Sequence, residues 1–389
     1  MEKKSFDVNN WGYSPHNKES FQHVRELFST VTLTAEETNT TSFEYKEEDI
    51  SKIKYELKFP GFEGEYTIQD MLDKTYTDSF LLMKDGVIIY EKYFNGMTEQ
   101  SVHLMNSVSK SFLGILIGTL VDEGLVKTEK LLTDYLPDFK DTGFSGTTVQ
   151  QALDMTGSVK YGEVYLERES DFWKETSVVG WRPALVNDKT PETLYEYARG
   201  LKEVEQENGS AFHYRTVYTN ILGMVAEKVT GKTLKDLLQK KLWEKICPEQ
   251  NAYIVCDKDE FPYMGAGMNA CTRDLARFGQ MIVNRGMFGN ERVVSEDWIV
   301  KTLAGTDKAR QNFEITEYTP LIPGGHYMNQ FWASSNSEIL ACVGIHGQGS
   351  YMNMANKTVA VKFSSHPDPD DGPLFIETFT ALDALTRSI

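Results

Sequence analysis

Apolar and polar side chains alternate in a way that predicts strands at both ends of this chain. Residues 80–94 contain two β-rich stretches on either side of Asp85-Gly86, a pair that favours the two-residue turn of a β-hairpin. Short apolar stretches separated by turn residues return near the end of the chain. They predict further strands over residues 329–333, 339–344, 350–354 and 358–364.

The middle of the chain carries the apolar period of helices, with residues of one face three or four positions apart. The helix predicted over 109–122 ends beside Gly124, because glycine readily takes the left-handed conformation found at helix ends. The helix predicted over 295–303 starts at Ser295, a good N-terminal cap. Further helices are predicted over 147–155, 191–198, 216–229, 233–246, 272–283 and 374–385.

Strands at both ends with helices between them predict an α/β (α+β) fold. We expect one antiparallel sheet that pairs the early hairpin with the late strands, flanked by helices, with a mostly helical subdomain beside it. Residues 66–105 and 290–389 would form the sheet subdomain and residues 106–289 the helical subdomain. Residues 1–65 are expected to be an irregular leader with one strand near 53–59. Together these parts would form one composite domain.

Composition and charge exclude several partners. The 389 residues carry 57 acidic and 40 basic side chains, a net charge of −17, so we expect repulsion of nucleic acid. No apolar run approaches the length of a membrane span, and the N-terminus lacks the apolar region of a secretory signal. Four cysteines without a C-x-x-C pair suit a reducing compartment. We therefore expect a cytoplasmic protein without a membrane partner. A homodimer is compatible with the sequence, although no feature of the sequence indicates one.

Ser107-Val108-Ser109-Lys110 is the strongest candidate for chemistry. Residues three positions apart share a helix face, so the Ser107 hydroxyl and the Lys110 amine can meet. The helix N-terminus and the apolar run 112–120 would both lower the lysine pKa, because each disfavours a cation. A neutral lysine can accept the serine proton and create a nucleophile. Ser51 and Lys54 have the same spacing but lie in a charged stretch without an apolar helix behind it.

Two further segments carry candidate groups. Tyr214 precedes the helix predicted at 216–229. There its phenol could lose its proton beside a protonated lysine and relay protons as a phenolate. Tyr218 is the alternative, since Tyr218-Thr-Asn220 reads as a Y-x-N motif. In the segment 342–348, glycines end an apolar strand. They allow close approach of a ligand to backbone N–H groups that could hold an oxyanion. Alternatively, Tyr214 only packs in the core, and the segment 342–348 is only a tight turn between two strands.

These three elements, in this order, resemble the serine β-lactamase and penicillin-binding-protein superfamily. The resemblance is greatest to its class C-like branch, which includes esterases and the 6-aminohexanoate-dimer hydrolases. It extends over about residues 75–370. The segments that carry the resemblance are 106–112, 180–182, 272–279, 329–332, 344–348 and 364–370.

The resemblance implies roles for several residues. Tyr214, nine residues before Gly223, would be the catalytic tyrosine, and Tyr218 a coincidence. Cys342-Val343-Gly344 would stand where the family has Lys-Thr-Gly, so the Ile345 N–H would hold the oxyanion beside that of Ser107. A shifted register would instead make His346, in His346-Gly347-Gln348, the polar group near the substrate.

The resemblance also implies substrate contacts. Tyr165 would match a mobile loop tyrosine, and Trp181, Gly265 and His346 complete the predicted substrate-binding residues. An acidic contact to a substrate amine would fall near Thr176, beside Glu175. The loops 158–190 and 305–328 would shape the pocket, whereas the acidic runs 47–49 and 368–371 are expected to be solvated.

Other chemistries lack support in the sequence. There is no G-x-S-x-G elbow, no phosphate-binding glycine loop and no cluster of metal ligands, so no cofactor and no metal are predicted. The predicted function is a serine hydrolase, an esterase or amidase. It would act through an acyl-enzyme on small esters or on linear and cyclic amides. A β-lactamase or D-amino-acid peptidase and a catalytically silent binding protein are the alternatives.

Overall fold

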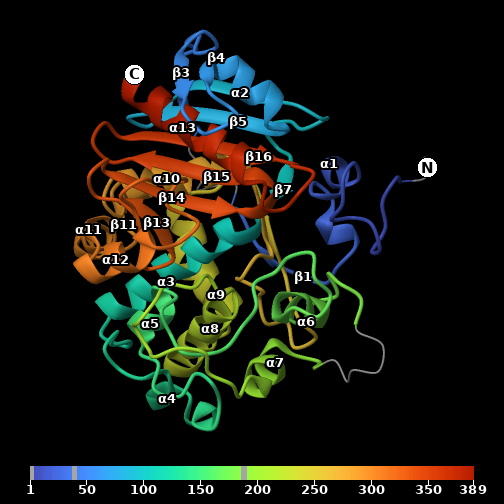
Figure 1. Ribbon diagram of the computed structural model, residues 1–389, viewed down its shortest axis with the longest axis vertical. Helices are drawn as coiled ribbons and strands as arrows, with labels where there is room; N and C mark the ends of the chain where they lie inside the picture. The colour runs from blue at the N-terminus through green and yellow to red at the C-terminus, as the bar shows by residue number, and fades with distance from the viewer. Residues whose placement is uncertain (1–3, 37–41, 185–190) are drawn as a thin grey trace.

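The computed structural model describes residues 4–36, 42–184 and 191–389 and contains one large sheet (Figure 1). Its strands follow the order β12-β13-β14-β15-β16-β5-β6-β2, antiparallel except for β2, which runs parallel to β6. This arrangement confirms the predicted fold class, because β16 pairs with β5 and joins the two ends of the chain. The strand bounds are β2 Glu44–Tyr45, β5 Thr77–Lys84, β6 Val87–Tyr93, β12 His326–Met328, β13 Phe331–Ser334, β14 Ile339–Gly344, β15 Gln348–Asn353 and β16 Thr358–Ser364.

The hairpin turn has the backbone that its two residues favour. Asp85 and Gly86 both have positive φ, 47° and 82°, as the two-residue turns that match strand twist require. Lys84 pairs with Val87 directly across this turn. The Asp-Gly pair therefore sets the register of the hairpin.

Helices cover both faces of the large sheet. Tyr351 of β15 donates a hydrogen bond to Asp383 of α13 (Gly372–Ser388), whereas Gly279 of α10 (Thr272–Val283) faces Val359 and the neighbouring Ser350. Tyr351 and Ser350 are adjacent along β15, so their side chains leave opposite faces. Both helices match predicted helices. The predicted subdomain bounds assign α10 to the helical subdomain, whereas in the structure it packs on the sheet.

A second sheet corrects the expectation that residues 1–65 are irregular apart from one strand. The sheet has the order β1-β8-β9-β7, and β1 (Thr30–Leu33) comes from this leader. The other strands are β7 Val102–Leu104, β8 Ala252–Val255 and β9 Met268–Cys271. The predicted strand near 53–59 is present as β3 (Lys54–Leu57), paired with β4 (Gly64–Thr67). Isolated short stretches with mixed side chains have little periodicity, so their strands become apparent only through their partners.

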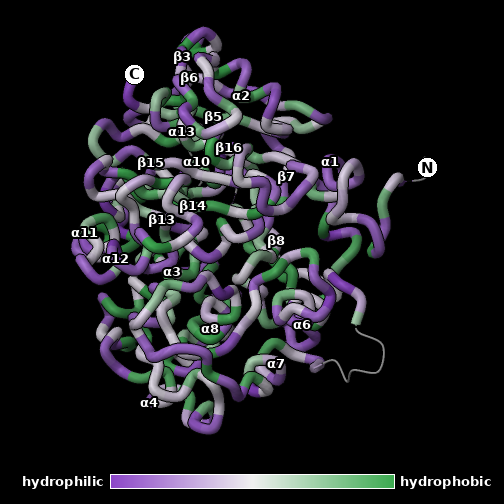
Figure 2. Tube along the Cα trace, in the orientation of Figure 1, coloured by the Kyte–Doolittle hydropathy of each residue, from purple (hydrophilic) through white to green (hydrophobic). Residues whose placement is uncertain are grey.

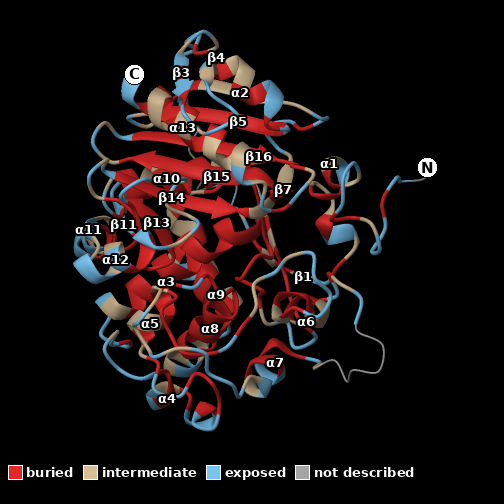
Figure 3. Cartoon of the chain, viewed as in Figure 1, coloured by how far each residue is buried: buried red, intermediate tan, exposed pale blue. Residues whose placement is uncertain are grey.

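In the middle region, α8 (Val217–Thr230) and α9 (Leu234–Leu238) pack on α3 (Ser109–Asp122), whose residues 109–120 are all buried (Figure 3). Such a helix is apolar on all sides because protein covers every face; Figure 2 shows the hydrophobic colouring of the neighbouring segments. No helix among the described residues has the length and apolar character needed to cross a membrane. The remaining helices of this region are α4 Leu132–Tyr135, α5 Val149–Leu153, α6 Asp171–Val178 and α7 Leu194–Gly200.

Several boundaries differ from the prediction. The helix expected from residue 191 begins at Leu194, because the Thr193 side chain accepts a hydrogen bond from Glu196 N and caps it there. The helix expected over 233–246 is α9 followed by a π turn, Gln239–Trp243, and a 3-10 turn, Glu244–Ile246. Short elements that were not predicted include α1 Asn17–Ser20, α2 Ile68–Lys74, α4, α6, α12 Asp307–Glu314, β10 Met287–Phe288 and β11 Glu291–Arg292. The helix predicted over 295–303 is present as α11, Glu296–Ala304.

Candidate active site

Ser107 and Lys110 meet at the start of α3, as their spacing predicts. The Lys110 Nζ donates to Ser107 Oγ at 2.8 Å and to the Gly265 carbonyl at 2.5 Å. The lysine is 1% exposed and the serine 8%. Burial lowers the pKa of Lys110 to about 8, although the carboxylates of Glu163 and Glu175 act in the opposite direction. A lysine with this pKa is a competent base near neutral pH.

A tight bend positions Ser107 between β7 and α3. Asn106 has a φ of 47°, a left-handed conformation that asparagine tolerates better than most residues. Its side chain donates to the Ile345 carbonyl at 3.0 Å and thereby ties the bend to the end of β14. The Ser109 hydroxyl donates to the Asn106 carbonyl at 2.6 Å. These contacts hold the serine at the helix start, where N–H groups lack partners within the helix.

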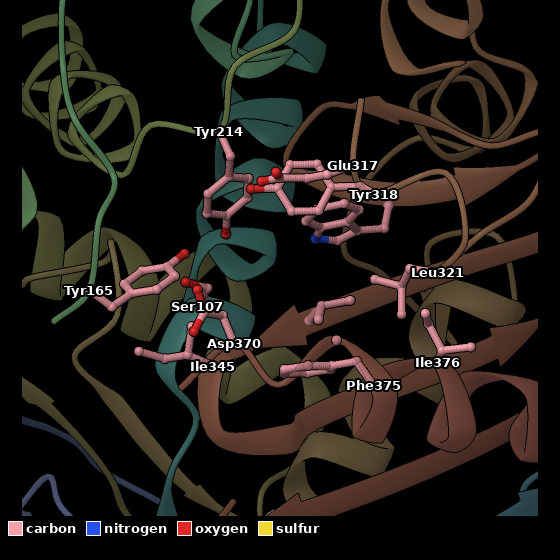
Figure 4. A pocket seen from close by; sticks show the side chains of 13 residues that line it. Ser107, Tyr165, Tyr214, Glu317, Tyr318, Leu321, Ile345, Asp370, Phe375 and Ile376 are labelled. Atoms are coloured by element: carbon pink, nitrogen blue, oxygen red, sulfur yellow. The ribbon is translucent and has the colours of Figure 1, made fainter. Parts of the chain in front are cut away.

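Tyr214 completes a cluster with Ser107 and Lys110. Its hydroxyl points toward Ser107 (Figure 4), and its ring centroid lies 4.9 Å from Lys110 Nζ. Burial raises the pKa of Tyr214 well above its usual value, so the resting group is a neutral phenol. Removal from water is the largest cause of this increase in the Tyr214 pKa, and it disfavours the phenolate. Tyr218 is fully buried and accepts from Val159 N at 3.2 Å, away from this cluster.

The end of β14 lies directly against Ser107. A Cβ on Gly344 would stand 3.0 Å from Ser107 N and 2.5 Å from the Met105 carbonyl, so the two chain segments touch at this glycine. Ile345 opens the next 3-10 turn, Ile345–Gly347, and its N–H has no partner within that turn. This contact agrees with the register Cys342-Val343-Gly344 rather than with the shifted one.

A cavity of about 350 Å³ opens beside Ser107 (Figure 4). The hydroxyl groups of Tyr165 and Tyr214 point toward the serine in this view. Two carboxylates, Glu317 and Asp370, line the cavity, and no lysine or arginine belongs to its described lining. The remaining wall is mostly apolar or aromatic: Tyr318, Leu321, Trp332, Val343, Ile345, Gly372, Phe375 and Ile376.

Three predicted substrate contacts lie outside this lining. Trp181 packs between Trp11 and Tyr263, with ring centroids 5.2 and 5.5 Å away. The His346 ring nitrogen Nδ1 is 2.7 Å from the His366 carbonyl, and burial lowers the His346 pKa to about 4. Gly265 contacts Lys110 through its carbonyl. No side chain fits at position 265, because a Cβ would stand 2.4 Å from Thr216 Cγ2. None of the three lines the cavity beside Ser107, whereas Trp181 and His346 line a smaller cavity together with Ile345.

The predicted acidic contact near Thr176 is also absent from the cavity. Thr176 is buried and donates to backbone carbonyls of its own helix. Glu175 accepts hydrogen bonds from Tyr161 and Asn220, and burial raises its pKa to about 8. Glu175 therefore lies in the protein interior, where its charge acts on Lys110, and it does not line the cavity.

Sequence reasoning missed the carboxylates that do line the cavity. Asp370 belongs to the run 368–371, which was expected to be solvated, and burial raises its pKa. Glu317 comes from the loop 305–328 that was expected to shape the pocket. Another carboxylate that was not predicted, Glu163, lies outside the cavity lining. It accepts hydrogen bonds from Thr216 N at 2.8 Å and from Thr216 Oγ1 at 2.6 Å, at the start of α8. No periodic signal marks these residues, since all three lie in loops.

The described residues contain no group of three histidine, cysteine, aspartate or glutamate side chains arranged to hold a metal ion. The chemistry of the cluster rests on the hydroxyl, amine and phenol groups of the chain itself. Such a cluster can perform nucleophilic catalysis, since the nucleophile and its base are within hydrogen-bonding distance.

Comparison with known proteins agrees with this geometry. The beta-lactamase family matches residues 67–382. The 6-aminohexanoate-dimer hydrolase of Paenarthrobacter ureafaciens is 30% identical over 387 residues, 97% of this chain and 94% of that protein. A Bacillus anthracis protein proposed to be a 6-aminohexanoate-dimer hydrolase has a structure with a TM-score of 0.88 and 26% identity, covering 99% of this chain and 98% of its own.

A class C beta-lactamase in complex with cefoxitin shares the fold, with a TM-score of 0.59 and 13% identity over 82% of this chain and 96% of its own. The family match covers most of the chain and the curated relative nearly all of it. The protein therefore belongs to the beta-lactamase family and is a hydrolase of that superfamily.

Proposed function

We propose that the protein is a serine hydrolase that cleaves small carboxylic esters and linear or cyclic amides through an acyl-enzyme. The observation that carries this proposal is the 2.8 Å contact between Lys110 Nζ and Ser107 Oγ at the edge of a cavity. A lysine in direct contact with a serine hydroxyl, with its pKa lowered by burial to about 8, is the arrangement of a base and its nucleophile.

The reaction begins when Ser107 Oγ attacks the substrate carbonyl and its proton passes to neutral Lys110. The carbonyl oxygen becomes an oxyanion, which the N–H groups of Ser107 and Ile345 stabilise. As the intermediate collapses, the scissile bond breaks and the leaving oxygen or nitrogen takes a proton from Lys110 through Tyr214. A neutral phenol suits this relay, because it can accept and donate a proton at the same time. Water then attacks the acyl-enzyme in the same manner, which releases the acid and restores Ser107.

The lining of the cavity supports uncharged or cationic acyl groups with an aliphatic chain. Leu321, Phe375 and Ile376 offer apolar area, and Glu317 and Asp370 would attract an ammonium group and repel a carboxylate. The amine and pentamethylene chain of a 6-aminohexanoate oligomer combine these features. Most β-lactams carry a carboxylate, and Cys342 stands where the family has its lysine, so this lining does not favour them.

Labelling with a fluorophosphonate probe tests the nucleophile without knowledge of the substrate. We expect the probe to modify Ser107, located by peptide mass mapping, and the Ser107→Ala protein to remain unlabelled. Ser51→Ala is the matched control, because Ser51 and Lys54 have the same spacing on the surface. Labelling elsewhere, or none while the protein is folded, contradicts the proposal. Hydrolysis of nitrocefin faster than of p-nitrophenyl butyrate favours a β-lactamase.

The pH dependence of ester hydrolysis tests the base. Lys110 must be neutral to accept a proton, so kcat/KM for p-nitrophenyl butyrate is expected to rise with pH and to level off above a midpoint near 8. The neutral ester does not titrate, and burial lowers the His346 pKa to about 4, far below this range. Burial raises the pKa of Glu175 to about 8, so the midpoint is measured in a Glu175→Gln variant as well and is expected to remain there. A profile that is flat between pH 7 and 9 contradicts the assignment of Lys110.

A further inference from the structure

Gln348 is a buried glutamine at the start of β15, directly after the turn that carries Ile345. The residue is 0% exposed. Its Nε2 lies within hydrogen-bonding distance of three backbone carbonyl oxygens, those of Ser364 at 2.7 Å, His346 at 3.1 Å and Ile345 at 3.3 Å. Its Oε1 accepts a hydrogen bond from Ser364 N at 3.1 Å. The amide therefore uses both its donor and its acceptor side on the backbone.

This amide continues the sheet beyond its last backbone pair. The strands β15 and β16 pair through their backbones as far as Gly349, which lies opposite Lys362. Past that pair, the Gln348 side chain donates to the Ser364 carbonyl and accepts from the Ser364 N–H. A neighbouring antiparallel strand exchanges the same two bonds. A side chain thus joins the end of β16 to the turn.

The turn needs such support because its backbone is uncommon. His346 and Gly347 both have positive φ, 61° and 87°, and few residues other than glycine adopt that conformation. The Ile345 carbonyl also accepts a hydrogen bond from the Asn106 side chain, at 3.0 Å. Two amides, one on β15 and one directly before the nucleophile in the chain, therefore hold Ile345 at its carbonyl.

The same contacts restrict the Ile345 N–H at the other end of the residue. Gly344, which precedes Ile345, is fixed by its pairing with Gln348 across the turn. The peptide group between Gly344 and Ile345 is thus held on both sides and has little freedom to rotate. A donor fixed in this way stabilises an oxyanion without reorganisation during the reaction.

We propose that Gln348 is a positioning residue of the oxyanion site, whose side-chain amide holds the turn so that the Ile345 N–H faces the substrate carbonyl oxygen. This inference rests on the proposed function, in which that N–H stabilises the oxyanion. Gln348 does not line the cavity beside Ser107, so it acts through the backbone and not on the substrate. Its loss should lower kcat and leave KM nearly unchanged, because the oxyanion forms only in the transition state.

Replacement of Gln348 by methionine, which has a similar length but no amide, tests the inference. We expect kcat for p-nitrophenyl butyrate to fall by about 10- to 100-fold, since a small displacement of a catalytic group has an effect of this size. Propylboronic acid is the second probe. The Ser107 oxygen bonds to its boron, the serine proton passes to Lys110, and the tetrahedral boron places an oxygen at the oxyanion position. Its inhibition constant should rise by a factor similar to the fall in kcat/KM.

Gln348→Glu is the second variant, for the case in which the methionine protein does not fold. Its carboxylate has the same size and can accept from Ser364 N, but it offers the three carbonyl groups no donor. Gln330→Met is the matched control. Gln330 is 1% exposed and donates to the Leu153 carbonyl at 2.9 Å, so this variant removes a buried amide of the same kind from another part of the protein. Its kcat should stay within about threefold of the wild type.

Three outcomes overturn the inference. In the first, a folded Gln348→Met or Gln348→Glu protein keeps kcat within about threefold of the wild type. In the second, kcat falls but the affinity for propylboronic acid does not, which places the effect outside the oxyanion site. In the third, Gln330→Met lowers kcat equally. Failure of the wild-type protein to hydrolyse p-nitrophenyl butyrate counts separately, against the proposed function.

Discussion

Replacement of Lys110 by methionine is expected to lower kcat for p-nitrophenyl butyrate by about 10⁴- to 10⁶-fold. Lys110 is the proposed base, in contact with Ser107 at 2.8 Å, and groups that act as one unit lose nearly all their joint effect when one is removed. The remaining rate would come from substrate binding and the oxyanion contacts. Steady-state and single-turnover kinetics measure this loss, and a residual rate within tenfold of the wild type would exclude Lys110 as the base.

The stability of the Lys110→Met protein separates chemistry from folding. The folded-state pKa of Lys110, about 8, is below its unfolded value, so the buried ammonium destabilises the fold at neutral pH, and this penalty fades as pH rises above 8. Methionine removes the penalty and also the hydrogen bond to Gly265. We expect a Tm within a few degrees of the wild type. Lys54→Met, in the surface copy of the motif, should leave kcat within twofold.

Replacement of Gly344 by alanine is expected to lower kcat by about 10²- to 10³-fold. The new methyl group would stand 2.5 Å from the Met105 carbonyl and 3.0 Å from Ser107 N, so β14 must move away from the serine. Such a movement displaces the Ile345 N–H, and loss of one oxyanion donor has an effect of this size. KM should change much less, because the donor acts mainly in the transition state. Initial rates over a range of ester concentrations separate the two constants.

Gly349→Ala on the neighbouring strand is the matched control for this substitution. A Cβ there would meet only the Cys342 carbonyl, at 3.6 Å, which is an ordinary contact. We expect its kcat to stay within threefold of the wild type. Equal loss of activity in both variants would indicate general damage to the sheet, and no loss in Gly344→Ala would show that the oxyanion is held elsewhere.

The elements that the sequence predicted best are those with local start and stop signals. The observed α3 spans Ser109–Asp122 and β14 spans Ile339–Gly344, as expected, because glycines and turn residues mark their ends. The strands β1, β8 and β9 had no such signal. They are short, and they become a sheet only because segments far apart in the chain pair with one another.

The same distinction between local signals and tertiary contacts applies to the residues of the candidate site. The Ser107–Lys110 contact follows from helix spacing alone, whereas Tyr214 was chosen by its family resemblance. Burial raises the pKa of Tyr214, and burial depends on everything packed around the residue. Trp181 and His346 were expected at the substrate for the same family reason, but the structure places them in the lining of a smaller cavity that also includes Ile345, and not in the lining of the cavity beside Ser107.

The sequence by itself determined the fold class and the pairing of a serine with a lysine on one helix face, because both depend on short-range periodicity and on residue chemistry. Only the tertiary structure decided which charges face the cavity: Glu317 and Asp370 line it, whereas Glu175 does not. The physical reason is that desolvation and charge pairing depend on contacts between residues distant in the chain, which no local pattern records.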